Sequence, residues 1–184
     1  MTSASPAPDA TDSAVVIPVP EAEAVVGPHR ARLDPFAAWG VPAHVTVLAP
    51  FVPPHAITGA AIEALAAAVA SVTAFDCEFP RTRWFGDRVV WLAPRPDDPF
   101  RALTGAVSAA FPGYLPYDGV HDEVVPHLTV GFSDAGDDGA LQTAEESLLT
   151  ELPVRTRVRC AWLMTGRNVP GGWRMLAELP LAGG

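Results

Sequence analysis

The sequence contains two stretches, His44-Val45-Thr46-Val47 and His127-Leu128-Thr129-Val130, that share the pattern His-x-Thr-x and closely follow a proline, Pro42 in one case and Pro126 in the other. In each stretch a β-branched or apolar residue fills every other position, which predicts a short β-strand. Successive side chains of a strand point to opposite faces, so the histidine and the threonine share one face and the aliphatic residues share the other. Each strand therefore presents one imidazole and one hydroxyl to the same space.

The repetition of this pattern exceeds what chance provides. Five histidines and twelve threonines among 184 residues would give about 0.3 His-x-Thr triplets. A second regularity accompanies the first: His44 and His127 lie 83 residues apart, Cys77 and Cys160 also lie 83 residues apart, and each cysteine follows its histidine by 33 residues. The simplest account is an internal duplication of a strand, helix and strand unit. Two such units packed around a pseudo-twofold axis would bring the motif strands face to face.

In these features the chain resembles the two-histidine (2H) phosphoesterase superfamily, which includes the 2′,5′ RNA ligase-like proteins and cyclic nucleotide phosphodiesterases. The resemblance runs from Val15 to about Leu181 and depends on three segments, residues 15–20 (Val-Val-Ile-Pro-Val-Pro), 42–51 and 126–132. It implies an α+β, two-lobed, pseudo-symmetric fold with antiparallel sheets flanked by helices and a central cleft.

The resemblance also implies roles for the motif residues. His44 and His127 would act as general base and general acid on a phosphodiester, Thr46 and Thr129 would hold the phosphate oxygens, and no metal would take part. Many RNA ligase-like members carry an arginine soon after the second motif, where this chain has Gly-Phe-Ser at residues 131–133. The acid/base pair therefore transfers to this chain, whereas the family's choice of substrate does not.

Length and composition indicate one globular domain. The chain has 184 residues, of which 49% are hydrophobic and 18% charged, enough for one substantial core. Residues 1–13 are small, polar and proline-containing, which predicts a disordered tail. We expect residues 14–184 to form a single bilobal domain with lobes at about 14–86 and 87–184. No apolar run is long enough to span a membrane and no signal-peptide pattern opens the chain, so we expect a cytoplasmic protein, and a monomer.

The charge of the chain limits its partners. The formal net charge is −9 and the chain has no lysine, which argues against a broad cationic surface for long nucleic acid. A phosphate-bearing partner should therefore be small, or be held locally by a few arginines. The two cysteines lack metal-ligand spacing, and we interpret them as reduced strand residues rather than a disulfide.

Hydrophobic periodicity and turn signals predict the other elements, and each half then reads as strand, helix, motif strand, helix and strand. Further strands are expected at residues 14–19, 75–79, 88–93, 154–164 and 173–181. Helices are expected at residues 28–39, 58–72, 97–111 and 140–152.

A phosphodiester needs a base on the nucleophile, an acid on the leaving oxygen, and donors for the remaining oxygens as negative charge accumulates. Histidine suits both proton-transfer roles because its ordinary pKa of about 6.5 lets one ring be neutral and another protonated near pH 7. A cationic donor would help the neutral hydroxyls. Arg83, Arg30 and Arg174 are the candidates, with Arg83 ranked first because it lies beside Trp84 at a predicted strand end. Aromatic residues on the cleft rim could stack a nucleobase, and the candidates are Trp84, Tyr117, Phe85 and Trp173.

These residues predict a metal-independent phosphoesterase without a cofactor, which hydrolyses a 2′,3′-cyclic phosphate or a related small nucleotide or RNA-end phosphodiester. Two alternatives stay open. The first is a non-catalytic module that binds a nucleotide or an RNA end in the same cleft. The second is a metal site that combines the motif histidines with Asp118, His121 or Asp122, although no tight ligand spacing supports it. The sequence does not assign the base and acid roles, or distinguish hydrolysis from ligation.

Overall fold

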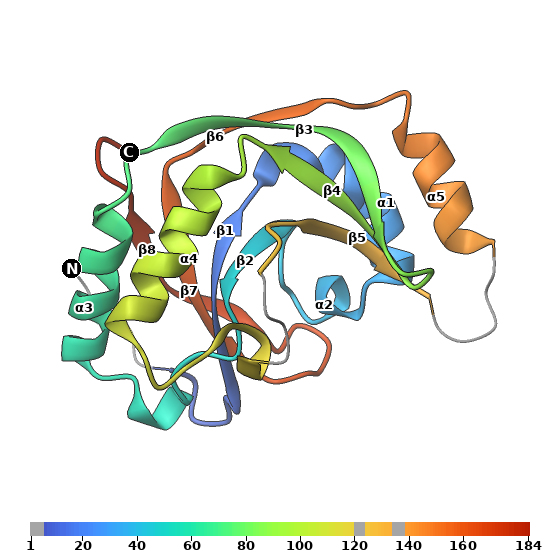
Figure 1. The fold of residues 1–184 in the computed structure, drawn as a ribbon. Coiled ribbons are helices and arrows are strands. Elements are labelled where there is room, and N and C mark those ends of the chain that lie inside the picture. The colour runs from blue at the N-terminus through green and yellow to red at the C-terminus, as the bar shows by residue number, and fades with distance from the viewer. Residues whose placement is uncertain (1–5, 120–123, 134–138) are drawn as a thin grey trace.

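The computed structural model describes residues 6–119, 124–133 and 139–184, and at its centre lies a curled antiparallel sheet of eight strands (Figure 1). The strand order is β6-β3-β4-β5-β2-β1-β7-β8. The motif strands β2 and β5 are therefore the central pair, and three strands flank them on each side. The strands are β1 (Asp12–Pro18), β2 (His44–Leu48), β3 (Phe75–Phe85), β4 (Val89–Arg95), β5 (Leu128–Phe132), β6 (Val154–Val158), β7 (Cys160–Gly166) and β8 (Arg174–Pro180).

Helices α1, α3, α4 and α5 cover the face of the sheet that points away from the motif histidines. In Figure 1, α3 and α4 lie together over one end of the sheet, and α1 and α5 lie at the other. The helices are α1 (Glu23–Leu33), α2 (Pro35–Ala38), α3 (Gly59–Ala70), α4 (Asp98–Ala110) and α5 (Ala140–Leu148), and short 3₁₀ turns occupy Pro20–Ala22, Pro54–Ala56 and Pro116–Gly119. The expected α+β fold with pseudo-symmetry is confirmed, with the predicted pair of sheets joined into one. No helix among the described residues is long and apolar enough to cross a membrane.

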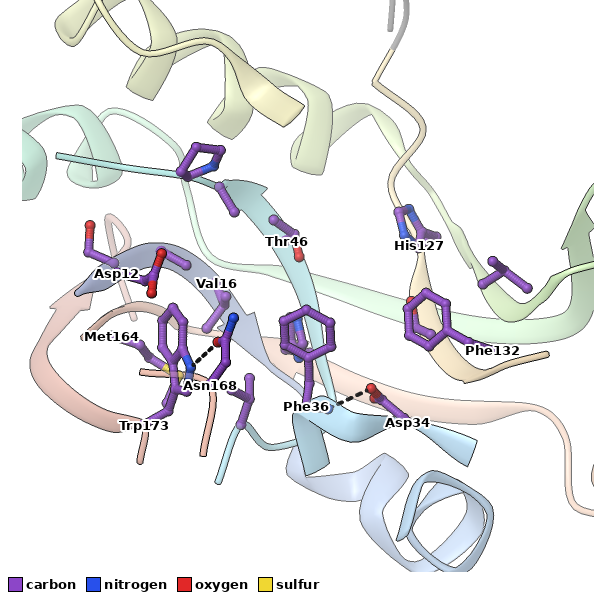
Figure 2. Close-up of a pocket in the computed structure, with 18 of the residues that line it drawn as sticks. Asp12, Val16, Asp34, Phe36, Thr46, His127, Phe132, Met164, Asn168 and Trp173 are labelled. Atoms are coloured by element: carbon purple, nitrogen blue, oxygen red, sulfur yellow. Dashed lines mark hydrogen bonds between the residues drawn. The ribbon is translucent and has the colours of Figure 1, made fainter. Parts of the chain in front are cut away.

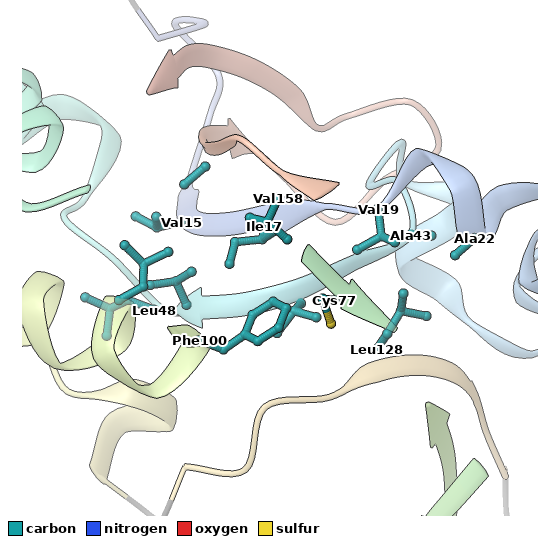
Figure 3. Close-up of a cluster of buried hydrophobic side chains, with 14 of the residues drawn as sticks. Val15, Ile17, Val19, Ala22, Ala43, Leu48, Cys77, Phe100, Leu128 and Val158 are labelled. Carbon is teal, nitrogen blue, oxygen red and sulfur yellow. The ribbon is translucent and has the colours of Figure 1, made fainter. Parts of the chain in front are cut away.

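One hydrophobic core joins the sheet to the helices. Val45 and Val47 of β2 belong to it together with Phe100 and Leu103 of α4, the helix that packs on β2, and Figure 3 shows part of this cluster around Ile17, Leu48 and Phe100. The aliphatic residues of the motifs are thus buried, as strand alternation requires. Their burial fixes the register of the central strands and turns each histidine and threonine to the opposite face.

The predicted helix at residues 28–39 is wrong in its bounds. α1 begins at Glu23 and continues through Pro28 to Leu33, and α2 follows at Pro35. The sequence interpretation placed Pro28 at a helix start because proline removes a backbone donor and disfavours a helix interior. The break instead falls at Asp34, whose carboxylate caps α2 by accepting a hydrogen bond from the Phe36 amide at 3.0 Å.

The predicted strand at residues 154–164 is two strands in different parts of the sheet. β6 pairs with β3 at one edge, and β7 pairs with β1 on the other side of the central pair. We call β2, β1, β7 and β8 the first half-sheet and β5, β4, β3 and β6 the second half-sheet. β3 comes from the N-terminal half of the chain yet lies in the second half-sheet, so the predicted lobe bounds of 14–86 and 87–184 do not separate the half-sheets.

The N-terminal strand also begins earlier than expected. Residues 1–5 of the predicted tail lie outside the described residues, whereas β1 starts at Asp12 and the Thr11 amide donates to the Gly166 carbonyl at 2.9 Å. Cys77 lies in β3 and Cys160 in β7, each the third strand from the centre of its half-sheet, and both thiols are free. Their matched positions agree with the internal duplication that their spacing predicts.

Candidate active site

The polar side chains of the two motifs lie on one face of the central strands. Val45 pairs with Leu128 in an antiparallel register. Continued by one residue in each direction, this register places His44 opposite Thr129 and Thr46 opposite His127. Cβ atoms of residues directly opposite are about 4.5–5.5 Å apart, and diagonal neighbours about 7–8 Å. The two imidazoles are therefore diagonal neighbours with a hydroxyl beside each, an arrangement that leaves room for one phosphate group.

The same backbone contact orients both rings. Nδ1 of His44 donates to the Pro42 carbonyl oxygen at 2.7 Å, and Nδ1 of His127 donates to the Val125 carbonyl oxygen at 2.7 Å. A carbonyl oxygen can only accept, so Nδ1 carries the proton in each neutral ring and Nε2 carries the lone pair. The backbone two residues before each motif histidine thus sets the tautomer needed for proton transfer through Nε2.

Burial lowers the pKa of both histidines. Desolvation is the largest cause in each, and the hydrogen bond to the backbone carbonyl partly opposes it. The pKa of His44 falls from 6.5 to about 4, with additional lowering by the charges of Arg30 and His127. Burial therefore favours the neutral form of both rings. A phosphate between them would favour the imidazolium form.

Arg30 is buried and does not line the cavity. Its side chain is 2% exposed, and Nε donates to Oδ2 of Asp34 at 2.9 Å while Nη2 donates to the Val41 carbonyl at 3.1 Å. Burial raises the pKa of the Asp34 carboxyl and the charge of Arg30 opposes that increase. Arg30 therefore holds the segment that enters β2, and the prediction that it contacts phosphate finds no support in its position.

Aromatic side chains from β3 and β4 surround His127. The Phe85 ring meets the imidazole edge-on at a centroid distance of 4.9 Å, and the Trp91 ring lies at 5.8 Å. Phe85 and Trp91 also stack on each other at 4.7 Å. This apolar wall contributes to the desolvation that lowers the pKa of His127. The sequence pointed to Phe85 as a rim residue and missed Trp91, which reads as an ordinary core residue of an apolar strand.

The histidines and threonines of both motifs line a cavity of about 890 Å³, within the range of about 300–1,000 Å³ typical of small-molecule sites. Figure 2 shows Thr46 and Phe36 near its middle and His127 and Phe132 toward one end. Most other lining residues are apolar. They include Val16, Val41, Phe85, Val89, Met164 and Trp173.

None of the arginines, all of which lie in the described ranges, lines this cavity. Arg83 is exposed on β3 and pairs with Trp91, which in turn pairs with Thr129. It therefore shares the face of the motif residues but lies two strands away from Thr129, with Trp91 between them. Arg174 is exposed at the start of β8. A direct contact between either arginine and the phosphate stays a prediction.

The remaining predicted contacts are placed differently. Trp84 points to the helix-covered face, where Nε1 donates to Oε2 of Glu145 at 2.9 Å, and the structure does not bring it to the cavity. Strand alternation is the reason, because Trp84 and Phe85 are successive residues of β3 and must face opposite ways. Tyr117 belongs to the 3₁₀ turn Pro116–Gly119, and its side chain lies outside the described residues.

A metal site is not formed by the described side chains, in which no three His, Cys, Asp or Glu residues gather in a suitable cluster. His121 and Asp122 lie outside the described residues, as does the side chain of Asp118. The metal alternative therefore remains to be tested in solution.

Comparison with solved structures gives matches that span most of both chains. E. coli LigT in complex with 3′-AMP is 19% identical, with a TM-score of 0.59 over 94% of this chain and 99% of that one. TT0787 of Thermus thermophilus is 17% identical, with a TM-score of 0.58 over 92% of this chain and 97% of that one. At such identities the likeness establishes the fold alone. The comparison with curated proteins found no match.

A family model provides the assignment. The model of the 2′-5′ RNA ligase superfamily matches residues 18–170, a span that contains both His-x-Thr motifs and the central strands. The match covers most of the chain, and the fold agrees with it. The chain belongs to the 2′-5′ RNA ligase superfamily of two-histidine phosphoesterases.

Proposed function

We propose that the protein is a metal-independent phosphoesterase that hydrolyses a 2′,3′-cyclic phosphate or a related small nucleotide or RNA-end phosphodiester. The observation that carries the proposal is the pair of imidazoles, oriented by identical backbone contacts and set diagonally with a threonine hydroxyl beside each. A similar fold supports it, because E. coli LigT has been solved in complexes with 3′-AMP, NADP+ and ATP, all of which carry phosphate.

The reaction follows from this arrangement. Nε2 of the neutral histidine takes a proton from a water molecule as its oxygen forms a bond to phosphorus. The P–O bond to a ribose oxygen breaks, and the other histidine, as imidazolium, donates its proton to that oxygen. Thr46 and Thr129 donate hydrogen bonds to the phosphate oxygens that gain charge. Each proton transfer contributes about 10²- to 10⁴-fold to the rate.

The surroundings of the two rings favour one assignment of roles. Desolvation and the charge of Arg30 hold the pKa of His44 near 4, which disfavours a proton on this ring, and we therefore assign the proton attracted by the bound phosphate to His127. His44 is then the general base and His127 the general acid. The apolar contact of His127 with Phe85 still permits protonation once an anion compensates the charge.

The first test is turnover of the four 2′,3′-cyclic nucleotides and a linear 2′,5′ dinucleotide, with a chelator present throughout. We expect His44→Ala and His127→Ala each to lower kcat/KM by at least about 10²-fold. The control is His55→Ala, because His55 is an exposed residue of the turn Pro54–Ala56 and lies away from the cavity lining. Activity that appears only without chelator would contradict the metal-independent mechanism.

A second substrate tests the roles. A 4-nitrophenyl phosphodiester has a leaving group that departs without protonation, so it bypasses the general acid. His127→Ala should then retain much of the wild-type rate, whereas His44→Ala should not. Equal losses in both variants would contradict the assignment.

One observation favours a non-catalytic alternative, a module that binds a nucleotide or an RNA end. No arginine lines the cavity, so no guanidinium among the described lining residues offsets the charge that develops on phosphate. This alternative predicts that nucleotides bind and are never turned over, and that alanine at either motif histidine weakens binding only.

A further inference from the structure

The end of the cavity remote from His127 has its own chemistry. Figure 2 shows Asp12, Met164, Asn168 and Trp173 gathered there, and all four line the cavity. None of them belongs to the His-x-Thr motifs, and the reaction described above does not use them. We therefore expect this part of the cavity to contact a part of the ligand other than the phosphate.

The wall that carries Asn168 and Trp173 is fixed by the backbone. The Gly171 amide donates to the Ala38 carbonyl at 2.9 Å, and the Trp173 amide donates to the Trp39 carbonyl at 2.8 Å. These bonds tie the loop between β7 and β8 to the end of α2. The Trp173 side chain also packs against a small buried cluster that contains Met164. The indole is consequently held as a preformed flat surface.

Two polar side chains line the same end of the cavity as this surface, and one can donate hydrogen bonds to a ligand while the other can accept them. Nε1 of Trp173 donates to Oδ1 of Asn168 at 3.1 Å, and since an indole N–H can only donate, the amide oxygen is occupied and the Nδ2 donors remain for a ligand. Asp12 accepts a hydrogen bond from the Thr11 hydroxyl, and no ion pair to it occurs among the described residues. The carboxylate therefore presents acceptor capacity to the cavity.

A carboxylate repels phosphate, so this end of the cavity suits the base of a nucleotide. An indole and a thioether offer apolar surface to a planar ring. Guanine presents two adjacent donors, N1–H and the N2 amino group, which a single carboxylate can accept, and an O6 acceptor for an amide donor. Adenine presents an amino donor beside a ring acceptor, so only one of the two carboxylate oxygens can accept a hydrogen bond from it.

We propose that Asp12, Asn168 and Trp173 form a base-binding subsite that selects guanine, which makes a guanosine phosphodiester the preferred substrate. This inference depends on the proposed function for its phosphate end. The spacing agrees with it. Val16 lies opposite Thr46, and Asp12 lies four residues before Val16, about 13 Å along the strand at 3.3 Å per residue. Such a span accommodates a purine nucleotide.

The test compares kcat/KM for the four 2′,3′-cyclic nucleotides in wild type and Asp12→Asn. We expect wild type to prefer the guanosine substrate by at least about tenfold and Asp12→Asn to lose that preference, because a bidentate contact to a base commonly provides this much discrimination. The control is Asp9→Asn, which removes a neighbouring carboxylate that pairs with Arg167 at 3.4 Å outside the cavity; it should retain the preference.

Binding of 3′-GMP and 3′-AMP by calorimetry separates the two proposals. Turnover with equal kcat/KM for all four bases would overturn the guanine subsite and leave the phosphoesterase intact. Tighter binding of 3′-GMP, abolished in Asp12→Asn, without turnover of any substrate would support the subsite and refute the phosphoesterase. A guanine preference that persists in Asp12→Asn would overturn the role of the carboxylate, and neither preference nor turnover would overturn both.

Discussion

Replacement of His44 by asparagine should change how the stability of the protein depends on pH. The folded-state pKa of His44 is about 4, against 6.5 for an unperturbed histidine. Between these pH values the unfolded chain binds a proton that the folded chain does not, so the free energy of unfolding rises with pH across this window. At about 1.4 kcal/mol per pH unit, His44 contributes about 3 kcal/mol, present above pH 6.5 and lost as the pH falls through 4.

Asparagine is the suitable replacement because its Nδ2 stands near the position of the histidine Nδ1 and can still donate to the Pro42 carbonyl. The measurement is urea unfolding of both proteins in steps of about half a pH unit, from about pH 4.5 to about pH 7.5. Carboxylates titrate in both proteins and cancel in the difference. As the pH is lowered across this range, the wild-type free energy of unfolding should fall relative to that of the variant by most of the contribution from His44, about 3 kcal/mol. A difference that does not change with pH would refute the argument that the cavity desolvates His44.

Three further predictions concern the phosphate donors, the buried ion pair and the aromatic side chain on the far face. Thr46→Val and Thr129→Val should each lower kcat/KM for a cyclic nucleotide by about 10²-fold with unchanged unfolding midpoints, since each removes one donor to the charged phosphate. Arg30→Met should lower the free energy of unfolding by about 3–5 kcal/mol because it leaves a buried carboxylate unpaired. Arg95→Met, at an exposed ion pair whose arginine is 71% exposed, should cost less than about 1 kcal/mol. Trp84→Phe should cost about 1 kcal/mol through its lost hydrogen bond while kcat/KM stays at the wild-type value.

The sequence alone predicts the two central strands because the alternation that indicates them lies within each motif. Alternation in the two motifs placed the histidines and threonines on one face, and the aliphatic residues that oppose them are buried as expected, as with Val45. The helix at α3 was equally accessible: Thr58 caps it by accepting from the Ala61 amide at 3.2 Å, and Leu65 and Val69 form its buried stripe. In each case residues within a few positions of one another determine the structure.

The rest of the site depends on contacts between distant segments. Trp84 was interpreted as a rim residue because it neighbours a turn, although Trp84 and Phe85 are successive residues of one strand and must face opposite ways. Alternation from the buried Phe79 would have turned Phe85 to the core, and the register shift between Glu78 and Arg81 reverses that expectation. Asn168 and Trp173 reach the cavity only because their loop docks on α2, and no local pattern encodes that docking. Asp12 would have been found if the alternation of β1 had been extended two residues toward the N-terminus.

The exchange of strands between the half-sheets has a consequence for the order of folding. β1 lies between β2 and β7, and β3 lies between β4 and β6, so each half-sheet combines strands from the N-terminal and the C-terminal halves of the chain. Neither can close until the segment after residue 154 has been synthesised. Closure of such long loops carries an entropic cost that slows folding. Neither half-sheet can therefore be completed by the strands of one copy of the duplicated unit alone.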